Sequence, residues 1–419
     1  MMSSQWSMKK STILHPVLVS ATMFVLGLAL GACAPKVEAP AEIVIGASIP
    51  QSGVLAAFGS YEEWGYTTAV NEANTEGGVF LSEFDARVPV RLILYDDESR
   101  PEKATENTER LVLRDHVNAL LGSATPPLVI SGAVVADREG VPMVTGIAPI
   151  RAFLGATEQW TWVWDIFFDE LKMTEQQFLT MDMVESNHKV ALFTDNEQDG
   201  VVMGGLWEEK APQFGYEIAY HASFPVGTTE YGDLIRRAQE AEAEIIIAQM
   251  ITPDAIALWR QMQALDYRPK AAFFEKGGEP VDWWAAHEGA AQGTMVAGYW
   301  HPAMGFPGAA ELRDRFEQET GQTYSQHIAD TYAAALVLLD GIERAGSLDP
   351  EAINAAIAET DTTYVVGPVK FTEGAGAHAA VLPISMLQWQ DGDLEVVYPA
   401  DLATAELIYP LPPWSEVSD

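Results

Sequence analysis

The octapeptide FTDNEQDG at residues 193–200 gathers acidic side chains whose types and spacing suggest chemistry. Asp195, Glu197 and Asp199 alternate and are followed by a glycine, which resembles the beginning of a calcium-binding loop. Such a loop needs a bidentate glutamate at its twelfth position, where this chain has Leu206, and a helix before it, where an apolar run predicts a strand. We therefore expect no metal site. A surface turn and a part of a pocket for an organic molecule remain as interpretations.

Common catalytic motifs do not occur in this sequence. It contains no G-x-S-x-G nucleophile motif and no G-x-x-x-x-G-K-[ST] phosphate loop, and His287-Glu288 lacks the second histidine that zinc proteases place four residues later. The segment GAGAHA (374–379) imitates a dinucleotide fingerprint, but Pro383 and another strand pattern follow it in place of a helix. We expect neither an enzyme nor a cofactor.

Residues 1–32 have the pattern of an export signal. Two lysines precede the apolar run ILHPVLVSATMFVLGLAL, which ends in the small residues GACA. The only cysteine, Cys33, directly follows LGA, which resembles the lipobox of bacterial lipoproteins, in which the cysteine is lipidated. The alternative is a signal peptide cleaved nearby and a cysteine there by chance. Residues 33–42 are then a Pro/Ala-rich tether between a lipid anchor in the membrane and the folded body.

Length and charge narrow the class of protein. A chain of 419 residues exceeds what one compact core usually holds, so we expect two domains. The sequence has 60 acidic against 24 basic residues, a formal net charge of -36, and 48% hydrophobic residues that can fill substantial cores. A field of that sign repels nucleic acid, so we expect no nucleic-acid partner. No segment after the signal is long and apolar enough to cross a bilayer.

From residue 43 onward, short apolar runs alternate with segments of helical length. The runs expected to be strands are 43–48, 88–97, 117–122, 141–146, 189–194, 244–250, 271–275 and 293–300. Apolar strands separated by helices indicate parallel sheets covered on both faces. The pattern restarts after the Trp-rich stretch WTWVWDIFFDE (160–170), which predicts two doubly wound α/β lobes. Ligands of such sheets bind beyond the carboxyl ends of the strands.

The opening of the exported body, IVIGASIPQSGVLAAFGSYEEWGYTTAVNEANTEGGV, resembles the leucine/isoleucine/valine-binding protein family. These are type I solute-binding proteins of ABC importers. Further similar segments, in the order that the family has them, are LILYDDESRPEKA, LLGSATPP, VPMVTGIAP, VALFTDNEQDG and VVGPVKFTEGAGAHAAVLPISMLQWQDGDLEV. The resemblance therefore covers essentially the whole chain after the signal.

The resemblance implies a type I periplasmic-binding-protein fold, in which two lobes joined by three crossovers close on a ligand like a Venus flytrap. By analogy, we expect the crossovers near Asp165, Met295 and Thr372. The expected limits are 43–164 with 295–371 for the first lobe and 165–294 with 372–419 for the second.

In the family, the loop after the third strand holds the ligand's carboxylate through a serine and backbone N–H groups. The resemblance carries this role to Ser123, Ala124 and Thr125, in the loop GSAT. The following helix would point its N-terminus at the ligand, which suits an anion. The alternative is an ordinary helix start capped by a hydroxyl residue.

Two further stretches match ligand-binding positions of the family. The next strand end, TGIAP, supplies Thr145, Gly146 and Ala148 to the amino-acid clamp, but Pro149 stands where the family has a threonine hydroxyl. This departure weighs against an α-amino acid as the ligand. Phe58 occupies the position of an aromatic wall, with a plain core phenylalanine as the alternative.

Asp199 occupies the slot in which many relatives carry a tyrosine that packs on the ligand. A carboxylate that faces a closed cleft needs a positive partner or several hydrogen-bond donors. We expect Asp199 to pair with an ammonium, guanidinium or amide N–H of the ligand, and the alternative is a helix N-cap that faces solvent. Asp195 and Glu197 are expected on the solvated surface.

The remaining ligand-binding candidates lie at strand ends of the second lobe or where the lobes hinge. They are Gln249, Met250, Glu275, Asp165 and Trp300. The family binds the ligand's amine through a glutamate in the region of Glu275, but Glu275 and Lys276 can also pair with each other or point outward.

Together these features predict an exported, lipid-anchored solute-binding protein, periplasmic or on the cell surface. It would be a monomer that captures a small polar solute, an amino acid or a related amine, amide or carboxylate, and delivers it to the membrane subunits of an ABC permease. One rival interpretation is a sensor on the same fold that passes its closed state to a signalling partner, and another is an exported enzyme.

Overall fold

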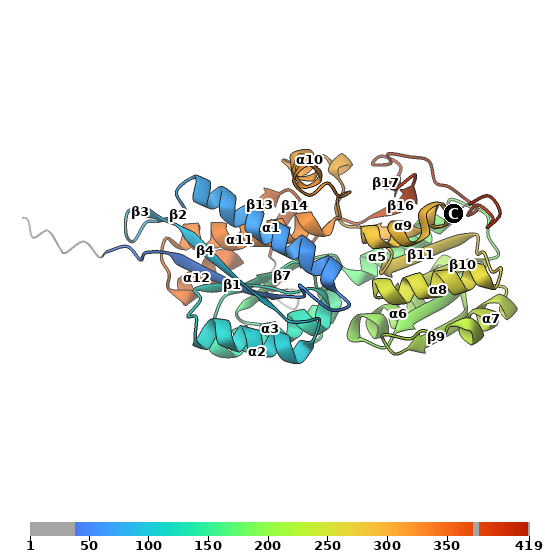
Figure 1. Ribbon diagram of the computed structural model, residues 1–419, viewed down its shortest axis with the longest axis horizontal. Coiled ribbons are helices and arrows are strands. Elements are labelled where there is room, and N and C mark those ends of the chain that lie inside the picture. The colour runs from blue at the N-terminus through green and yellow to red at the C-terminus, as the bar shows by residue number, and fades with distance from the viewer. Residues whose placement is uncertain (1–37, 372–376, 418–419) are drawn as a thin grey trace, which may run out of the picture. The chain divides into compact units, whose positions relative to one another are not determined.

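The computed structural model of the protein describes residues 38–371 and 377–417. Its main features are two large sheets with helices on both faces of each (Figure 1). The expected export signal, Cys33 and the expected crossover near Thr372 lie outside the described residues. The folded body that contains both sheets begins at Ala39.

The first sheet has six strands, and every neighbouring pair in it is parallel. In spatial order the strands are β15 (Ala379–Val381), β7 (Val163–Phe167), β6 (Met143–Thr145), β5 (Ala119–Leu121), β1 (Ile43–Ile49) and β4 (Val90–Asp96). Because all run in the same direction, their carboxyl ends meet at one edge of the sheet, where a ligand site is expected.

The position of strand β1 explains why its sequence is apolar at all positions but one. Its side chains alternate between two cores, so that Ile43 and Ile45 pack on one face while Val44 packs with Leu111 on the other. Gly46 has no side chain because α2 approaches too closely, and an added Cβ would lie 2.8 Å from Cδ2 of Leu111. Its single polar side chain, Ser48, is also buried and accepts a hydrogen bond from Asn107.

Helices cover both faces of this sheet. Figure 1 shows α1 and α11 on one side of it and α2 and α3 on the other. The helices of this half are α1 (Ala56–Thr75), α2 (Pro101–Leu113), α3 (Thr125–Glu139), α4 (Ile150–Leu154), α10 (Ala309–Thr320), α11 (His327–Ala345) and α12 (Pro350–Ala358). Helix α11 is buried along most of its length, which its apolar run AAALVLL explains.

The second sheet has seven strands. In spatial order they are β17 (Asp393–Tyr398), β16 (Ser385–Gln390), β12 (Met295–Gly298), β11 (Ala271–Lys276), β10 (Ile245–Met250), β8 (Lys189–Asp195) and β9 (Glu217–Phe224). The five strands from β12 to β9 are parallel, and β16 and β17 add an antiparallel edge.

The second sheet is also covered on both faces. In β10, Ile245 and Ile247 belong to one core and Ile246 and Ala248 to the other. Its helices are α5 (Glu170–Met181), α6 (Gln198–Lys210), α7 (Gly232–Glu240), α8 (Thr252–Ala264) and α9 (Val281–His287). The prediction of two doubly wound parallel lobes is confirmed.

Short elements complete the described chain. They are the hairpins β2 (Val79–Leu81) with β3 (Ala86–Val88) and β13 (Asp361–Tyr364) with β14 (Gly367–Lys370), and the 3-10 helices η1 (Ala211–Phe214), η2 (Glu288–Ala291) and η3 (Pro302–Met304).

The chain passes between the two sheets after β7, after β12 and after β15. The lobe limits expected from the sequence differ from these sheets at three strands, since β7 and β15 lie entirely in the first sheet and β12 lies in the second. The physical reason is simple. The chain leaves a sheet at the carboxyl end of a strand, whereas the expected limits stood before or within strands.

Candidate ligand-binding site

A cavity of about 50 Å³ lies where the carboxyl ends of strands of both sheets meet, and residues from both lobes line it. A concave space lined by apolar side chains and a few polar groups suits a small organic molecule. The lining residues are Phe58, Thr125, Pro126, Ile147, Pro149, Phe167 and Phe168 from the first lobe and the passage after β7, Asp199, Gln249, Glu275, Lys276, Glu279, Val296, Ala297 and Tyr299 from the second lobe and the passage after β12, and Gln326 and His327 at the start of α11.

Aromatic rings form one wall of the cavity. The rings of Phe167 and Phe168 lie 4.5 Å apart, and Tyr299 packs against both, at 4.6 and 5.6 Å between ring centroids. Phe58 approaches the ring of His327 to 4.9 Å. Phe167, Phe168 and Tyr299 stand at two passages between the sheets, so movement at these passages would reshape the aromatic wall directly.

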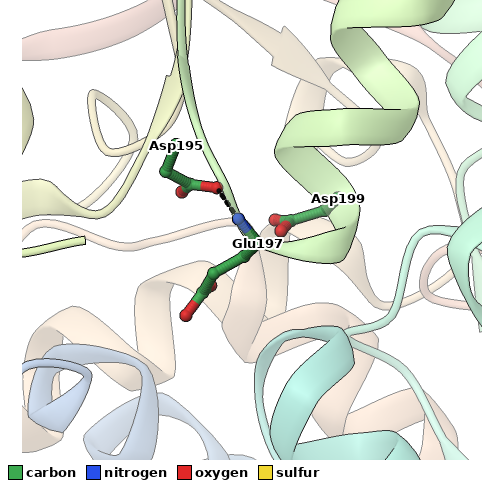
Figure 2. A group of neighbouring side chains, drawn as sticks. All are labelled: Asp195, Glu197 and Asp199. Atoms are coloured by element: carbon green, nitrogen blue, oxygen red, sulfur yellow. Dashed lines mark hydrogen bonds between the residues drawn. The ribbon is translucent and has the colours of Figure 1, made fainter. Parts of the chain in front are cut away.

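The acids of FTDNEQDG form a charge cluster with one lysine. Figure 2 shows Asp195, Glu197 and Asp199 converging at the end of β8 and the first turn of α6, with the Glu197 amide N–H donating to Asp195. The Lys276 ammonium lies 3.0 Å from Asp199 Oδ2, 3.1 Å from Glu197 Oε2 and 3.7 Å from Asp195 Oδ2. We call these four residues the Lys276 cluster.

The Lys276 cluster places an internal cation where a metal ion would otherwise be considered. Ligand oxygens of the three acids lie within 4.8 Å of one another, close enough to share an ion. The ammonium already contacts all three carboxylates, and it offsets one of the negative charges that would attract a metal ion. Burial alone would lower the pKa of Lys276, but the carboxylates of Asp199, Asp195 and Glu197 outweigh it and raise that pKa, so the cation is permanent.

Asp195 corrects the expectation of a solvated surface. Its side chain is fully buried, and burial raises the pKa of its carboxyl group. The reason is the position of Asp195 as the last residue of β8, a strand inside the sheet. Glu197, two residues later, is partly exposed.

Glu275 is a buried acid whose two oxygens are both occupied. Oε1 accepts from the Gln177 side chain at 2.6 Å, and Oε2 accepts from the Ala297 N–H at 2.9 Å. Gln177 is itself held by the Trp207 indole at 2.6 Å. Glu275 therefore ties β11 to β12 and to α5, and it pairs neither with Lys276 nor with any other cation among the described residues. Burial raises its pKa to about 7.

Glu279, in the loop between β11 and α9, joins the second lobe to the start of α11. Its Oε1 accepts from the Ser325 hydroxyl at 2.7 Å and from the Gln326 N–H at 3.0 Å. Its Oε2 has no hydrogen-bond partner in the described chain, and the nearest basic group is His327 Nε2 at 3.6 Å. Burial raises the pKa of Glu279 to about 7 and lowers that of His327 to about 3, so His327 is neutral at physiological pH.

Thr125 begins α3 in a conformation that is unusual for its side chain. Its φ of +61° lies in the left-handed region, which β-branched residues avoid. Its hydroxyl is buried and has no hydrogen-bond partner within the described residues. Such strain persists only where surrounding structure enforces it, and it gathers at binding sites.

Five residues predicted from the sequence line the cavity. They are Phe58, Thr125, Asp199, Gln249 and Glu275. Asp199 is buried, which excludes the solvent-facing N-cap, and its Oδ2 accepts from Gln249 at 3.0 Å as well as from Lys276. The positive partner that was expected from the ligand is thus supplied by the chain itself for one of the two carboxylate oxygens.

Eight other predicted residues are buried nearby without lining the cavity. They are Ser123, Ala124, Thr145, Gly146, Ala148, Asp165, Met250 and Trp300. The Ser123 hydroxyl donates to Asp97 at 2.9 Å, and the Trp300 indole donates to the Val365 carbonyl at 2.8 Å. Met250 packs in the core of the second sheet.

Other predicted residues that do not line the cavity lie at strand ends of the first lobe. Thr145 and Asp165 face each other in the pairing of β6 with β7, and both are fully buried. An added Cβ at Gly146 would come within 2.9 Å of the Asp330 carbonyl, so α11 fixes this glycine. Burial raises the pKa of Asp165 well above its usual value.

Twelve of the lining residues were not predicted from the sequence, and Glu279, Tyr299, Phe168 and His327 are among them. Glu279 follows the strand end of β11 within GGEP, a signal that was available. His327 carried no such signal, because it opens a helix and reaches the cavity only through the packing of α11 on the first sheet.

Comparisons with known proteins agree with this architecture. Residues 42–393 match the model of a family described as periplasmic binding protein. A relative, Leu/Ile/Val-binding protein homolog 8 of Brucella suis, is 23% identical over 399 residues, which cover 91% of this chain and 96% of the relative.

Two solved structures have the same fold. One is the branched-chain amino acid transporter substrate binding protein LivJ of Streptococcus pneumoniae in complex with isoleucine, with a TM-score of 0.74, 21% identity and coverage of 85% of this chain and 100% of that one. The other is a solute binding protein of an ABC transporter from R. palustris in complex with benzoate, with a TM-score of 0.72, 16% identity and coverage of 85% and 95%.

These relatives are binding proteins and not enzymes, in line with the expectation from the sequence. Among the described residues, no helix combines the length and the apolar character needed to span a bilayer. The matched family implies a location outside the cytoplasm. The match spans most of the chain, the two-lobed fold is the type I fold that the resemblance implied, and the protein therefore belongs to the periplasmic binding protein family.

Proposed function

We propose that the protein is the solute receptor of an ABC importer, which captures a small polar solute between its lobes and delivers it to a membrane permease. The observation that carries this proposal is the cavity itself. Both lobes line it, and three of its buried polar atoms, on Thr125, Asp199 and Glu279, have no hydrogen-bond partner among the described residues. Buried polar groups are normally paired, so a solute is the natural partner.

Contacts from both lobes explain how binding becomes a signal. A ligand shifts an open–closed equilibrium only by its preference for one state. Here Thr125 and Phe58 come from the first lobe, while Asp199 and Glu279 come from the second. A solute that touches both sets favours the closed form, and the surface of that form is what the permease would recognise.

The ligands of the relatives support a small organic solute without naming it. The LivJ structure holds isoleucine and the R. palustris protein holds benzoate. Both are compact organic molecules, the kind of solute that a cavity between two lobes encloses. An amino acid, or a related amine, amide or carboxylate, is accordingly the class proposed at this level.

We further propose that Cys33 carries the lipid that anchors the protein to a membrane. The support is its position after LGA and the apolar run of the signal. Mass spectrometry of the N-terminal peptide tests this. A diacylated or triacylated Cys33 is expected, and a mature chain that begins elsewhere would contradict it.

Native mass spectrometry of the purified protein tests the receptor function. A co-purified small molecule should appear as an added mass that is lost on unfolding. The same compound, added back at about 100 times its dissociation constant, should stabilise the folded protein by about 2.7 kcal/mol. The absence of any bound mass, together with no thermal stabilisation by a broad panel of small solutes, would overturn the proposal.

A further inference from the structure

Three residues that line the cavity each have a buried polar atom that lacks a hydrogen-bond partner among the described residues and is able to accept one. These atoms are Oδ1 of Asp199, Oε2 of Glu279 and the hydroxyl oxygen of Thr125. The three side chains belong to residues that are at most 4% exposed, so water cannot serve them freely once the cavity is filled. Two of the three atoms belong to carboxyl groups, which in their ionised form only accept. The solute must therefore present donors.

The cations around the cavity are already engaged. Lys276 is the only lysine or arginine among the described lining residues, and its ammonium contacts three carboxylates of its own cluster. His327 is neutral, because burial lowers its pKa to about 3. A ligand carboxylate would find no positive partner without breaking the Lys276 cluster.

Two positions in the first turn of the helix that the resemblance places at the ligand's carboxylate have no N–H here. The first turn of α3 reads Thr125-Pro126-Pro127, and a proline has no backbone N–H to offer an anion. The N-terminus of a helix binds anions through these N–H groups. The hydroxyl of Ser123, the other expected donor, is given to Asp97 at 2.9 Å. At this point the described first lobe offers a carboxylate no lysine or arginine, and its remaining donors are the N–H groups before the two prolines and the Thr125 hydroxyl.

The two unpaired carboxylates differ in charge balance. Asp199 is neutralised by Lys276, whereas Glu279 has no cation beside it in the described structure. An isolated buried carboxylate is costly, and a ligand cation that pairs with it recovers that cost. Tyr299 and Phe58 belong to the same lining, and aromatic faces attract cations. Negative charge without a counter-ion and aromatic rings together suit an organic ammonium.

We propose that the solute is a small organic amine that carries no carboxylate group, and that Glu279 is the counter-ion of its ammonium. This inference rests on the proposed receptor function and narrows it. It predicts that the protein rejects the α-amino acid corresponding to each amine, since the added carboxylate would lie near Asp199 and Glu279 without a cation of its own.

Calorimetric titration with matched pairs tests the inference at about pH 8, where aliphatic amines are still protonated. The pairs are 3-methylbutylamine with leucine, phenethylamine with phenylalanine, and putrescine with ornithine. In each pair the first compound lacks the carboxylate and is otherwise the same. We expect at least one amine to bind 10-fold or more tightly than its amino acid, which corresponds to about 1.4 kcal/mol.

Two variants locate the counter-ion. Glu279→Gln keeps an oxygen for Ser325 and Gln326 but removes the charge, and it should weaken binding of the amine at least 10-fold. Glu230→Gln removes one exposed acid that does not line the cavity, and it should leave the affinity unchanged. Circular dichroism of both variants checks that they fold. Unchanged affinity in a folded Glu279→Gln protein would overturn the role of Glu279.

The outcomes separate this inference from the receptor function. Tighter binding of the amino acids than of their amines would overturn the inference and leave the receptor standing, as would a co-purified solute that contains a carboxylate. A co-purified amine without a carboxylate would support the inference even if no compound of the panel binds. No bound mass and no binding by any compound would overturn both.

Discussion

Asp199 and Glu279 line the same cavity from the same lobe, yet the protein treats their charges in opposite ways. Asp199 has the Lys276 ammonium at 3.0 Å and the Gln249 amide at 3.0 Å. Glu279 has only neutral donors, the Ser325 hydroxyl and the Gln326 N–H, on one oxygen, and the other has no hydrogen-bond donor among the described residues.

The different partners of these two carboxylates indicate that one stabilises the folded protein and the other is available to bind a solute. A buried carboxylate that is neutralised within the chain contributes to a fixed arrangement, since removing its partner would leave a charge without compensation. A buried carboxylate without a counter-ion is instead a cost that binding can remove. The Lys276 cluster therefore stabilises the second lobe, whereas the carboxylate of Glu279 is the group that we propose to pair with the solute.

The largest effect on stability is expected when the ammonium of the Lys276 cluster is removed. Lys276→Met removes the ammonium from three carboxylates, two of them buried, and should lower the free energy of unfolding by about 3–5 kcal/mol in urea denaturation. Lys172→Met, which removes an exposed pair with Glu175, should cost at most about 1 kcal/mol. Equal, small losses in both variants would contradict the structural role of the cluster.

A smaller effect of opposite sign is expected at Glu279 in the ligand-free protein. Its pKa in the folded state is about 7, above the usual 4.5, so the folded state binds the proton more tightly than the unfolded state does. Stability from this group is therefore greatest below about pH 4.5 and is lost as the pH rises toward 7.

The Glu279→Gln variant has no carboxyl group at this position to ionise, so it does not lose this stability as the pH rises. Its stability relative to the wild type should increase from pH 5 to pH 8, by about 3 kcal/mol at most, in thermal denaturation at several pH values. A stability difference that is independent of pH would show that Glu279 is paired in the folded protein.

The affinity for an amine should rise with pH as Glu279 ionises. Binding of a cation favours the carboxylate, so the affinity should increase by up to about 10-fold per pH unit below 7 and level off above it. Of the groups that face Glu279, His327 is neutral throughout this range, and burial keeps the pKa of Asp330, Tyr61 and Tyr299 well above their usual values. Glu275, elsewhere in the cavity lining, titrates near the same pH in both proteins. Titration calorimetry of the wild type and of Glu279→Gln checks this, and an identical pH dependence in both would contradict it.

The smallest effect is expected at Thr125. Its hydroxyl has no other partner among the described residues, so Thr125→Ala should weaken solute binding severalfold, in keeping with about 1 kcal/mol for one hydrogen bond. Thr125→Ser retains the hydroxyl and should bind like the wild type. If serine fails to restore the affinity lost in alanine, the residue acts through its backbone and not through its hydroxyl.

Local patterns in the sequence were sufficient to predict two lobes of parallel strands covered by helices. The runs 43–48, 189–194 and 244–250 became β1, β8 and β10, because strands buried on both faces leave a continuous apolar signature. The passages between sheets were less accessible. Strand β7 lies in the Trp-rich stretch, and β12 was assigned to the wrong side of a passage, because sheet membership depends on pairing between strands far apart in the chain.

The site was predicted in its location but only in part in its contacts. The rule that ligands bind at strand ends pointed to Asp199, Gln249 and Glu275, which line the cavity. It did not reveal that Lys276, 77 residues after Asp199, neutralises it, nor that His327 faces Glu279. These pairs arise from neighbouring strand ends and from a helix packed on the other lobe, and no spacing in the sequence encodes them.

A crystal structure of the protein with its co-purified solute would decide whether Glu279 is reserved for the ligand. We predict a compound in the cavity that contacts both lobes, with a nitrogen within hydrogen-bonding distance of Glu279 Oε2 and with the Lys276 cluster intact. A solute carboxylate bound to Lys276, or a compound that contacts one lobe alone, would contradict this prediction.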